Sequence, residues 1–387
     1  MTHTDARVTQ TPQAPPAGRR LPLLDVLRGV AILGTLMTNV WIFTGPGAEW
    51  GALESGMATG PVEGTFGVLA NGKFLSLLTI LFGVGLAIQY ASAQRRGQPW
   101  PGRYRWRALF LFAEGTVHFV LVFAWDVLMG YAVTALLVAR LLTRSERAQR
   151  RVMWWAAGLH LTLMGLLTAA IAAADDGSGG GTVSRDVVDL YAHGGYLDQV
   201  AFRLENALAL RMEPVLTFFL LLFLFLLGVR LFRAGAFGAD ETGRRLRSRL
   251  LAWGIGLGLP LNVAATLAGP DLFLLARYGA APLLALGYIG LIGAVVDRVR
   301  RPGPLLTGLT SVGRTALSGY VLQNVLCVLI SYGIGLGLAE RFADSGPWWV
   351  VALWATVCAV LMVGSTLWLR RFSAGPLESV QKWALRR

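Results

Sequence analysis

Apolar runs of roughly 18 to 25 residues recur along the whole chain, and short clusters of arginine separate them. A helix of that length can cross the hydrocarbon core of a bilayer. Only 15% of the 387 residues are charged, so there are too few charges to cover a surface that faces water. The sequence therefore predicts an all-α protein, a polytopic helical bundle embedded in a membrane.

The arginine clusters predict how this bundle is oriented. Most of the 35 basic residues fall in the loops of one side if ten spans alternate across the membrane, and an odd number of spans would break this pattern. Loops rich in Lys and Arg stay in the cytoplasm, so both termini are predicted there. The ten predicted spans cover residues 24–43, 73–94, 107–125, 127–143, 151–174, 212–234, 250–268, 273–296, 314–338 and 347–369.

The chain divides into five regions on this basis. Residues 1–18 are polar and rich in proline, which predicts a disordered cytoplasmic tail. Residues 19–174 hold helices 1–5, residues 212–371 hold helices 6–10, and residues 372–387 form a basic cytoplasmic segment. Residues 175–211 form an extracytoplasmic loop with apolar residues at helical spacing, which predicts an amphipathic helix. Whether this loop only seals the bundle or forms a substrate lid stays open.

The first predicted span, residues 24–43, carries a polar stripe on an otherwise apolar helix. Arg28, Thr35 and Asn39 fall within about 20° of one line at 100° per residue. Asp25 lies on a neighbouring part of the same face. Polar side chains are costly against lipid, so the stripe should face other helices or a water-filled cavity. Snorkelling to the headgroups is the alternative for Arg28, but it explains neither Asn39 nor the alignment.

The third predicted span, residues 107–125, contains the strongest candidate for chemistry. Glu114 and His118 are four residues apart and share one face, with His118 near the middle of the membrane. Histidine is suited to accept and return a proton, Glu114 would orient it or stabilise its cation, and Asp126 ends the helix. The alternative is a neutral core histidine bonded to a backbone carbonyl, with Glu114 protonated or paired to Arg28.

The ninth predicted span, residues 314–338, also has polar side chains at helical spacing. Tyr320, Gln323 and Asn324 share one face, and Arg314 stands at the cytoplasmic end. In a bilayer such groups need partners. Hydrogen bonds between helices would satisfy them, and contact with a ligand is the other interpretation.

Three further features have structural alternatives. Lys73 stands at the outer start of the second span, where anchoring at the interface is its commoner role and ligand contact the alternative. His160 has no charged partner within one turn and is predicted to be structural. The glycine-rich residues 253–269 predict a helix that is either kinked or packed very closely against a neighbour.

Several classes of protein do not fit the chain. The net charge of +13 suggests nucleic-acid binding, but the spacing of the arginines between apolar runs is that of membrane loops, so no nucleic-acid partner is expected. Cys327 and Cys358 both lie in apolar runs, which predicts reduced thiols. No cluster of metal-ligating residues is present in the sequence, so no metal site is predicted.

Five motifs resemble the YeiB-like family of bacterial membrane proteins, a domain of unknown function. They occur in the same order over most of the chain, and the resemblance implies a multi-pass protein of the bacterial plasma membrane. The motifs are LDVLRGVAILGTLMTNV, GKFLSLLTILFGVGLAIQ, EGTVHFVLVFAWDVLMGYAV, VGRTALSGYVLQN and LRRFSAGPLESV.

This family is in turn distantly similar to transmembrane acyltransferases, including heparan-glucosaminide N-acetyltransferase, which share an LDxxRG-type first helix. That likeness implies acyl-CoA as the acyl donor and a hydroxyl or amine acceptor, a small molecule or a lipid or glycan. Asn39 occupies the position of the catalytic histidine of the O-acyltransferases, so the role of base would pass to His118. Asn39 and Gln323 would then stabilise the oxyanion.

The ligand contacts expected under this hypothesis come from several spans, and we expect Arg28, Asn39 and His118 to converge on one chamber. Two alternatives remain: a transporter with an intramembrane Arg–Glu–His relay, and a non-catalytic membrane component. Besides the bilayer and the acceptor, a homodimer is compatible with the sequence. The expected ligand contacts are Arg28, Asp25, Arg314, Gln323, Tyr320 and Lys73, and the expected catalytic group is His118, Glu114, Asp126 and Asn39.

Overall fold

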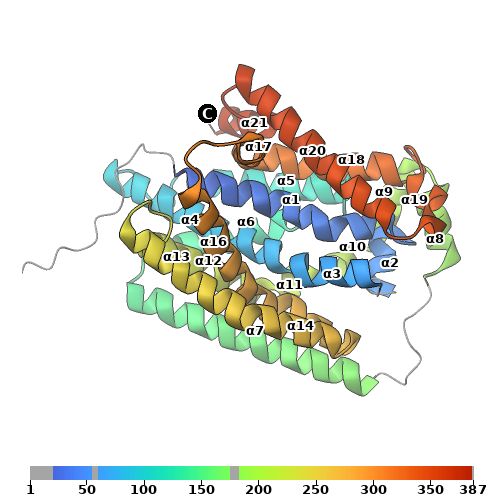
Figure 1. The fold of residues 1–387 in the computed structure, drawn as a ribbon, viewed down its shortest axis with the longest axis horizontal. Helices are drawn as coiled ribbons and strands as arrows, with labels where there is room; N and C mark the ends of the chain where they lie inside the picture. The colour runs from blue at the N-terminus through green and yellow to red at the C-terminus, as the bar shows by residue number, and fades with distance from the viewer. Residues whose placement is uncertain (1–20, 55–59, 175–182, 386–387) are drawn as a thin grey trace, which may run out of the picture.

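The computed structural model describes residues 21–54, 60–174 and 183–385, and the predicted tail at residues 1–18 lies outside them. Every regular element in these ranges is helical. Most helices run along the longest axis of the molecule (Figure 1). The predicted all-α bundle is confirmed.

The first half of the chain supplies the helices between Pro22 and Leu210. Prolines at the start of several helices, such as Pro22, fit there because the first helical residues need no N–H partner. The helices are α1 (Pro22–Thr44), α2 (Ala48–Glu54), α3 (Pro61–Ala70), α4 (Lys73–Arg95), α5 (Tyr104–Leu121), α6 (Leu128–Leu141), α7 (Glu146–Ala174), α8 (Arg185–Ala192), α9 (Tyr196–Glu205) and α10 (Ala207–Leu210).

The second half packs against α1 and α4 and ends in a short helix beside the start of α18. Its elements are α11 (Met212–Leu216), α12 (Phe218–Arg233), α13 (Glu241–Trp253), η1 (Gly254–Gly258), α14 (Leu259–Leu267), η2 (Pro270–Leu272), α15 (Phe273–Leu275), η3 (Ala276–Ala280), α16 (Ala281–Arg298), α17 (Pro304–Arg314), α18 (Ala316–Ser331), α19 (Leu338–Arg341), η4 (Ala343–Ser345), α20 (Trp348–Arg371) and α21 (Pro376–Ala384).

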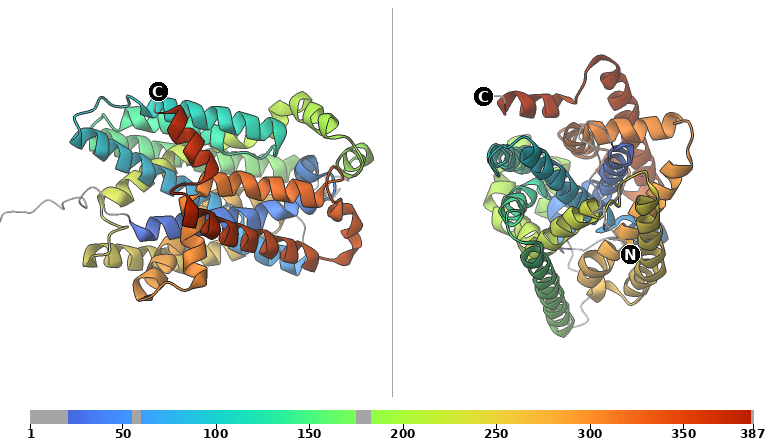
Figure 2. Two further views of the ribbon diagram at one scale, coloured as in Figure 1. Left: turned by 90° about the horizontal axis from the view of Figure 1, so that it is seen from above. Right: turned by 90° about the vertical axis from the view of Figure 1, so that its left-hand side faces the viewer.

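The two ends of the bundle differ in character. The end at which α1 begins also holds the C-terminal α21, and residues of α21 line one cavity there together with Arg28, Arg107 and Arg314; we call it the basic end. The opposite end holds α2, α8, α9 and α19, and we call it the cap end (Figures 1 and 2).

Six helical segments in the described ranges are long and apolar enough to cross a membrane. They begin at Pro22, Pro61, Glu146, Glu241, Pro270 and Trp348. Two shorter apolar helices, Leu128–Leu141 and Ala316–Ser331, lie among them. In the Glu146 and Glu241 segments most side chains face outward, as expected of helices that lipid covers.

Two predicted spans end at the wrong residue. The third was expected to continue to residue 125, but α5 ends at Leu121 and an irregular segment leads to Asp126. Both Asp126 carboxylate oxygens accept the N–H of Leu128, the first residue of α6, so Asp126 lies just before the next helix and bonds its start. The ninth was expected as one helix over 314–338, but Arg314 ends α17, and α18 ends at Ser331.

The backbones of α1 and α17 are in direct contact, because glycines lie where the two helices cross. A Cβ atom on Gly313 would lie 1.7 Å from the carbonyl oxygen of Asp25, and one on Gly29 would lie 2.0 Å from that of Leu309. Only glycine allows so close an approach at both positions. The contact fixes the face of α1 that carries Asp25 against a neighbouring helix.

The glycine-rich segment 253–269 combines both of its predicted features. Residues Gly254–Gly258 form a turn of π-helix, η1, which interrupts the α-helical ladder between α13 and α14. A Cβ atom on Gly254 would lie 2.1 Å from the backbone nitrogen of Gly287 in α16. The helix is therefore irregular and also in close contact with its neighbour.

Candidate functional site

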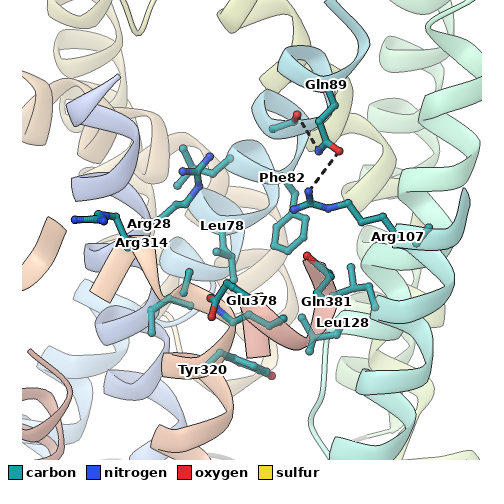
Figure 3. A pocket seen from close by; sticks show the side chains of 18 of the residues that line it. Arg28, Leu78, Phe82, Gln89, Arg107, Leu128, Arg314, Tyr320, Glu378 and Gln381 are labelled. Atoms are coloured by element: carbon teal, nitrogen blue, oxygen red, sulfur yellow. Dashed lines mark hydrogen bonds between the residues drawn. The ribbon is translucent and has the colours of Figure 1, made fainter. Parts of the chain in front are cut away.

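A cavity of about 300 Å³ lies at the basic end, between α1, α4, α5, α18 and α21. We call it the arginine cavity. Figure 3 shows Arg28 and Arg314 on the side opposite Arg107, with Tyr320 at the far end. Its polar lining consists of Arg28, Gln89, Tyr104, Arg107, Arg314, Tyr320, Glu378 and Gln381.

The three arginines of this cavity are only partly neutralised. Arg28 donates to Asp25 at 3.0 Å, which is compatible with the placement of both on neighbouring parts of one face of α1. Arg107 makes a long hydrogen bond of 3.4 Å to the Gln89 side chain. Among the described residues, no ion pair or hydrogen bond holds Arg314. Guanidinium groups with free donors are suited to bind phosphate or carboxylate.

Glu378 is the one carboxylate among the described lining residues, and both of its oxygens already accept hydrogen bonds from the start of α18. One oxygen of Glu378 accepts the N–H of Leu317 at 2.8 Å, and the other accepts the Ser318 hydroxyl at 2.6 Å. The C-terminal helix α21 thereby caps the start of α18, where N–H groups lack partners. Sequence reasoning missed this role because α21 was assigned only as a basic segment.

His118 lies in a buried polar group behind the cavity. The Asn324 amide nitrogen faces its Nε2 at 3.1 Å, so Nε2 accepts and the ring hydrogen belongs on Nδ1. Nδ1 in turn faces the Asp126 carboxylate at 3.6 Å. The ring packs over that of Tyr320 with centroids 5.3 Å apart. Nδ1 makes no hydrogen bond within the described residues, so Asp126 is the nearby carboxylate that a small movement would bring into hydrogen-bond distance of it.

Glu114 does not take the predicted part in this group. Neither of its buried carboxylate oxygens has a hydrogen-bond partner in the described part of the chain, so it pairs with neither His118 nor Arg28. Two side chains four residues apart share a helix face without having to touch. The polar neighbours of His118 are instead Asp126, just before α6, and Asn324 in α18.

A second, smaller pocket of about 40 Å³ lies nearer the cap end, and we call it the polar pocket. Asn39, Thr35 and Thr38 line it from α1. An ion pair between Glu213 and Arg277, 2.8 Å long, closes another side. A pocket of this size has room for one or two small polar groups.

Leu78 and Tyr320 line both the arginine cavity and the polar pocket, and we call these two side chains the partition. Arg28 therefore lies on one side of the partition and Asn39 on the other. His118 lines neither space and is 2% exposed.

The expected convergence of Arg28, Asn39 and His118 on a single chamber is therefore wrong for this structure. Side chains aligned along one helix face point in the same direction, but they can lie at different depths in the bundle. Arg28 and Asn39 are eleven residues apart, which is about 16 Å along the helix axis. The partition stands between those two depths.

The remaining predicted contacts fall into different places. Gln323 donates to the Thr35 hydroxyl at 3.5 Å and lies between α18 and α1, in neither space. Lys73 is 2% exposed and donates to the carbonyl of Gly67, so it holds the turn between α3 and α4. His160 bonds the Tyr278 carbonyl at 3.1 Å, in agreement with a structural role. No metal-holding cluster occurs among the described residues.

The cap end contains a buried ion pair that sequence reasoning missed. The Nε of Arg203 donates to Glu49 at 2.8 Å, and both side chains are fully buried. The same carboxylate accepts the Tyr191 hydroxyl at 2.8 Å and the Ala124 N–H at 3.1 Å. We call Glu49, Arg203 and Tyr191 the cap cluster. It joins α2, α8, α9 and the α5–α6 connection.

The Glu49 carboxylate stabilises the charged form of Arg203 in the cap cluster. Burial alone lowers the pKa of the Arg203 guanidinium, but the Glu49 carboxylate more than offsets this and raises the pKa above its ordinary value. Burial and then the Glu49 charge raise the pKa of the Tyr191 phenol well above its ordinary value. Tyr191 therefore stays protonated and donates to Glu49. Glu49, Tyr191 and Arg203 lie in three separate short helices, so no periodic pattern within one helix could have paired them.

Comparison with known proteins agrees with the order of the motifs. Residues 231–387 match the family model described as "Protein of unknown function (DUF418)". The chain is 27% identical over 386 residues to the uncharacterized protein YxaH of Bacillus subtilis (strain 168), covering 93% of this chain and 92% of that one. It is 28% identical over 382 residues to the uncharacterized protein YeiB of Escherichia coli (strain K12), covering 92% and 93%. Residues 231–387 therefore match a DUF418 region, and the chain is similar over nearly its whole length to YxaH and YeiB, in agreement with the predicted resemblance to the YeiB-like family.

Proposed function

We propose that this protein is a membrane acyltransferase of the bacterial plasma membrane. It would take an acyl group from acyl-CoA at the basic end and pass it to a hydroxyl or amine acceptor on the other side. One observation supports this most: the arginine cavity and the polar pocket enter the bundle from different depths and meet at the partition of Leu78 and Tyr320. The basic end is the cytoplasmic side under the positive-inside rule.

The arginine cavity fits the donor. Arg28, Arg107 and Arg314 offer guanidinium groups to the CoA phosphates. Beyond them the wall becomes apolar and suits an uncharged, narrow chain such as the pantetheine arm. That wall consists of Leu78, Leu81, Phe82, Leu111 and Leu128. A thioester at the end of this arm would lie against the partition.

The chemistry would take place at the partition. The acceptor O–H or N–H gives its proton to His118 Nε2 as its oxygen or nitrogen bonds to the thioester carbonyl carbon. The C–S bond then breaks, and the CoA thiolate takes the proton from His118 as it leaves. Asp126 holds the imidazole in the required tautomer, and Asn39 donates to the developing oxyanion.

This reaction requires one movement. His118 lies behind the Tyr320 ring and its Nε2 is occupied by Asn324, so Tyr320 must turn aside before an acceptor can reach the imidazole. Turning Tyr320 would also join the arginine cavity to the polar pocket, because that side chain lines both. Binding of the donor would supply the free energy for this change.

A transporter is the second candidate, and the same partition favours it. Two spaces at different depths, separated by two side chains, are also the arrangement of a closed conformation in alternating access. In that case the arginine cavity would hold an anion that crosses the membrane unchanged.

One experiment separates the two functions. Purified protein in lipid nanodiscs is incubated with labelled acetyl-CoA and with a lipid and glycan extract from a strain that lacks the gene. The proposal expects release of free CoA thiol and transfer of label to an extract component, both lost in His118→Ala. Unaltered acetyl-CoA, together with anion counterflow in liposomes that does not depend on CoA, would overturn it in favour of transport.

A matched pair of variants tests the donor site within the same assay. Arg107→Gln is expected to raise the KM for acetyl-CoA, because this side chain lines the cavity. Arg105→Gln should leave it unchanged, because the guanidinium of Arg105 lies 5.6 Å from the ring of Trp106 and outside the cavity lining.

A further inference from the structure

A third pocket, of about 200 Å³, lies at the cap end between the α1–α2 turn, α8, the end of α18 and α19. It shares no lining residue with the arginine cavity or the polar pocket. We call it the aromatic pocket, after Phe43, Tyr191 and Tyr332 in its wall. Sites for drug-sized molecules have volumes of about 300–1,000 Å³. This pocket is smaller, so it suits a single small group.

Two hydroxyl groups in the wall of this pocket have no partner. Ser331 is 1% exposed and Tyr332 is 2% exposed, and neither hydroxyl oxygen has a hydrogen-bond partner in the described part of the chain. A buried polar group left unpaired costs about 1–3 kcal/mol. Two such groups among the residues that line one pocket indicate that a polar ligand completes them.

The charge of the pocket restricts what that ligand can be. The described residues that line it include no Arg, Lys or His, while Glu340 brings a carboxylate to its rim. Glu340 is more than half exposed and lies 3.4 Å from Nε2 of His193. An anion would therefore meet a carboxylate and find no cation in the wall.

The aromatic rings of the pocket also favour a cationic ligand. The ring centroids of Tyr191 and Tyr332 lie 5.0 Å apart, and those of Phe43 and Tyr332 lie 6.0 Å apart. Aromatic faces attract cations that come within about 6 Å of a ring centroid. Rings, a carboxylate and two acceptor oxygens together are complementary to an organic ammonium group.

We propose that the aromatic pocket binds a small primary ammonium compound. Its three N–H groups donate to Ser331 Oγ, to the Tyr332 hydroxyl oxygen and to the Glu340 carboxylate, and its carbon chain packs against the aromatic rings. A primary ammonium fits better than a quaternary one, because only N–H groups satisfy the two unpaired hydroxyls. The site does not depend on acyl transfer and would also serve a transporter.

Two small molecules of nearly the same shape test the charge requirement. Ethanolamine carries an ammonium group, and ethylene glycol replaces it with a hydroxyl. Binding of each to the full-length protein in nanodiscs is measured by ligand-observed NMR at pH 8. We expect ethanolamine to bind at least tenfold more tightly than ethylene glycol, with choline in between.

Variants locate the binding. Ser331→Ala and Glu340→Gln should each weaken ethanolamine binding about tenfold, since each removes a hydrogen bond to a charged group. Tyr332→Phe keeps the ring and should weaken ethanolamine but not choline. Asp344→Asn is the control, because Asp344 is an exposed acid in η4 that does not line the pocket.

Three results would overturn the proposal. They are equal binding of ethanolamine and ethylene glycol, no measurable binding of ethanolamine, and equal effects of Glu340→Gln and Asp344→Asn. Glu340 is exposed, so Glu340→Gln remains a valid test even if Ser331→Ala or Tyr332→Phe fails to fold. An intact acyl-transfer assay with no ethanolamine binding would overturn this site and leave the proposed function standing.

Discussion

The cap cluster offers the sharpest test of how the ends of this bundle are held together. Replacing Arg203 by Met removes the only charge that faces Glu49 among its described contacts, and leaves a fully buried carboxylate bonded to Tyr191 and to the Ala124 N–H. Breaking one partner of a buried ion pair costs about 3–5 kcal/mol. In large domains the Tm falls by about 2 °C for each kcal/mol of lost stability, so Tm should fall on the order of 5 to 10 °C in this variant.

The matching change on the other side is Glu49→Gln. It leaves the Arg203 guanidinium buried without a counter-charge, so it should cost a similar amount. The double variant Arg203→Met, Glu49→Gln has no buried charge. Its side-chain carbonyl at position 49 can still accept from Tyr191. The loss of stability in the double variant should therefore be smaller than the sum of the losses in the two single variants.

Thermal unfolding can be followed with a thiol-reactive dye, because Cys327 and Cys358 are both buried and become reactive when the bundle opens. Arg244→Met serves as the control. It breaks a pair with Glu241 in which both side chains are about half exposed, and such surface pairs contribute about 0–1 kcal/mol. Equal Tm losses for Arg203→Met and Arg244→Met, or strictly additive losses in the double variant, would refute the reasoning.

Three other predictions concern the core of the proposed site. Gly313→Ala should lower Tm, because the new Cβ would lie 1.7 Å from the Asp25 carbonyl and push α1 from α17, whereas Gly364→Ala has open space and should be neutral or stabilising; equal effects in a dye-based scan would contradict this. Glu378→Ala should cost about 0.5–2 kcal/mol by uncapping α18, measured in the same scan, and no loss would show that the cap is not needed. Asp126→Asn should lower kcat for acyl transfer about a hundredfold or more with little change in the KM for acetyl-CoA, because Asp126 does not line the arginine cavity, and an unchanged kcat would remove Asp126 from the mechanism.

Contacts within one helix were the part of the site that the sequence could predict. Arg28 and Asp25, three residues apart, were placed on neighbouring parts of one helix face, and they form an ion pair at 3.0 Å. The location of Arg28 in a cavity rather than against lipid also agrees with the polar stripe on α1. Hydrophobic spacing predicted the all-α membrane architecture, because a span needs a fixed length of apolar residues whatever its neighbours are.

Contacts between distant segments could not be predicted. His118 was paired with Glu114 because they are four residues apart, but its amide partner, Asn324, is 206 residues away. Glu49 and Arg203 are 154 residues apart and both lie in segments without a long apolar period. Periodicity gives the direction in which a side chain points, whereas the partner depends on how the helices pack.

The central claim is that the arginine cavity binds the CoA part of an acyl donor. Equilibrium binding of CoA to purified protein in nanodiscs tests this most directly, with Arg107→Gln and Arg105→Gln measured beside the wild type. We expect saturable binding that weakens as salt rises, at least tenfold weaker in Arg107→Gln and unchanged in Arg105→Gln. No saturable binding, or the same loss in both variants, would contradict the claim.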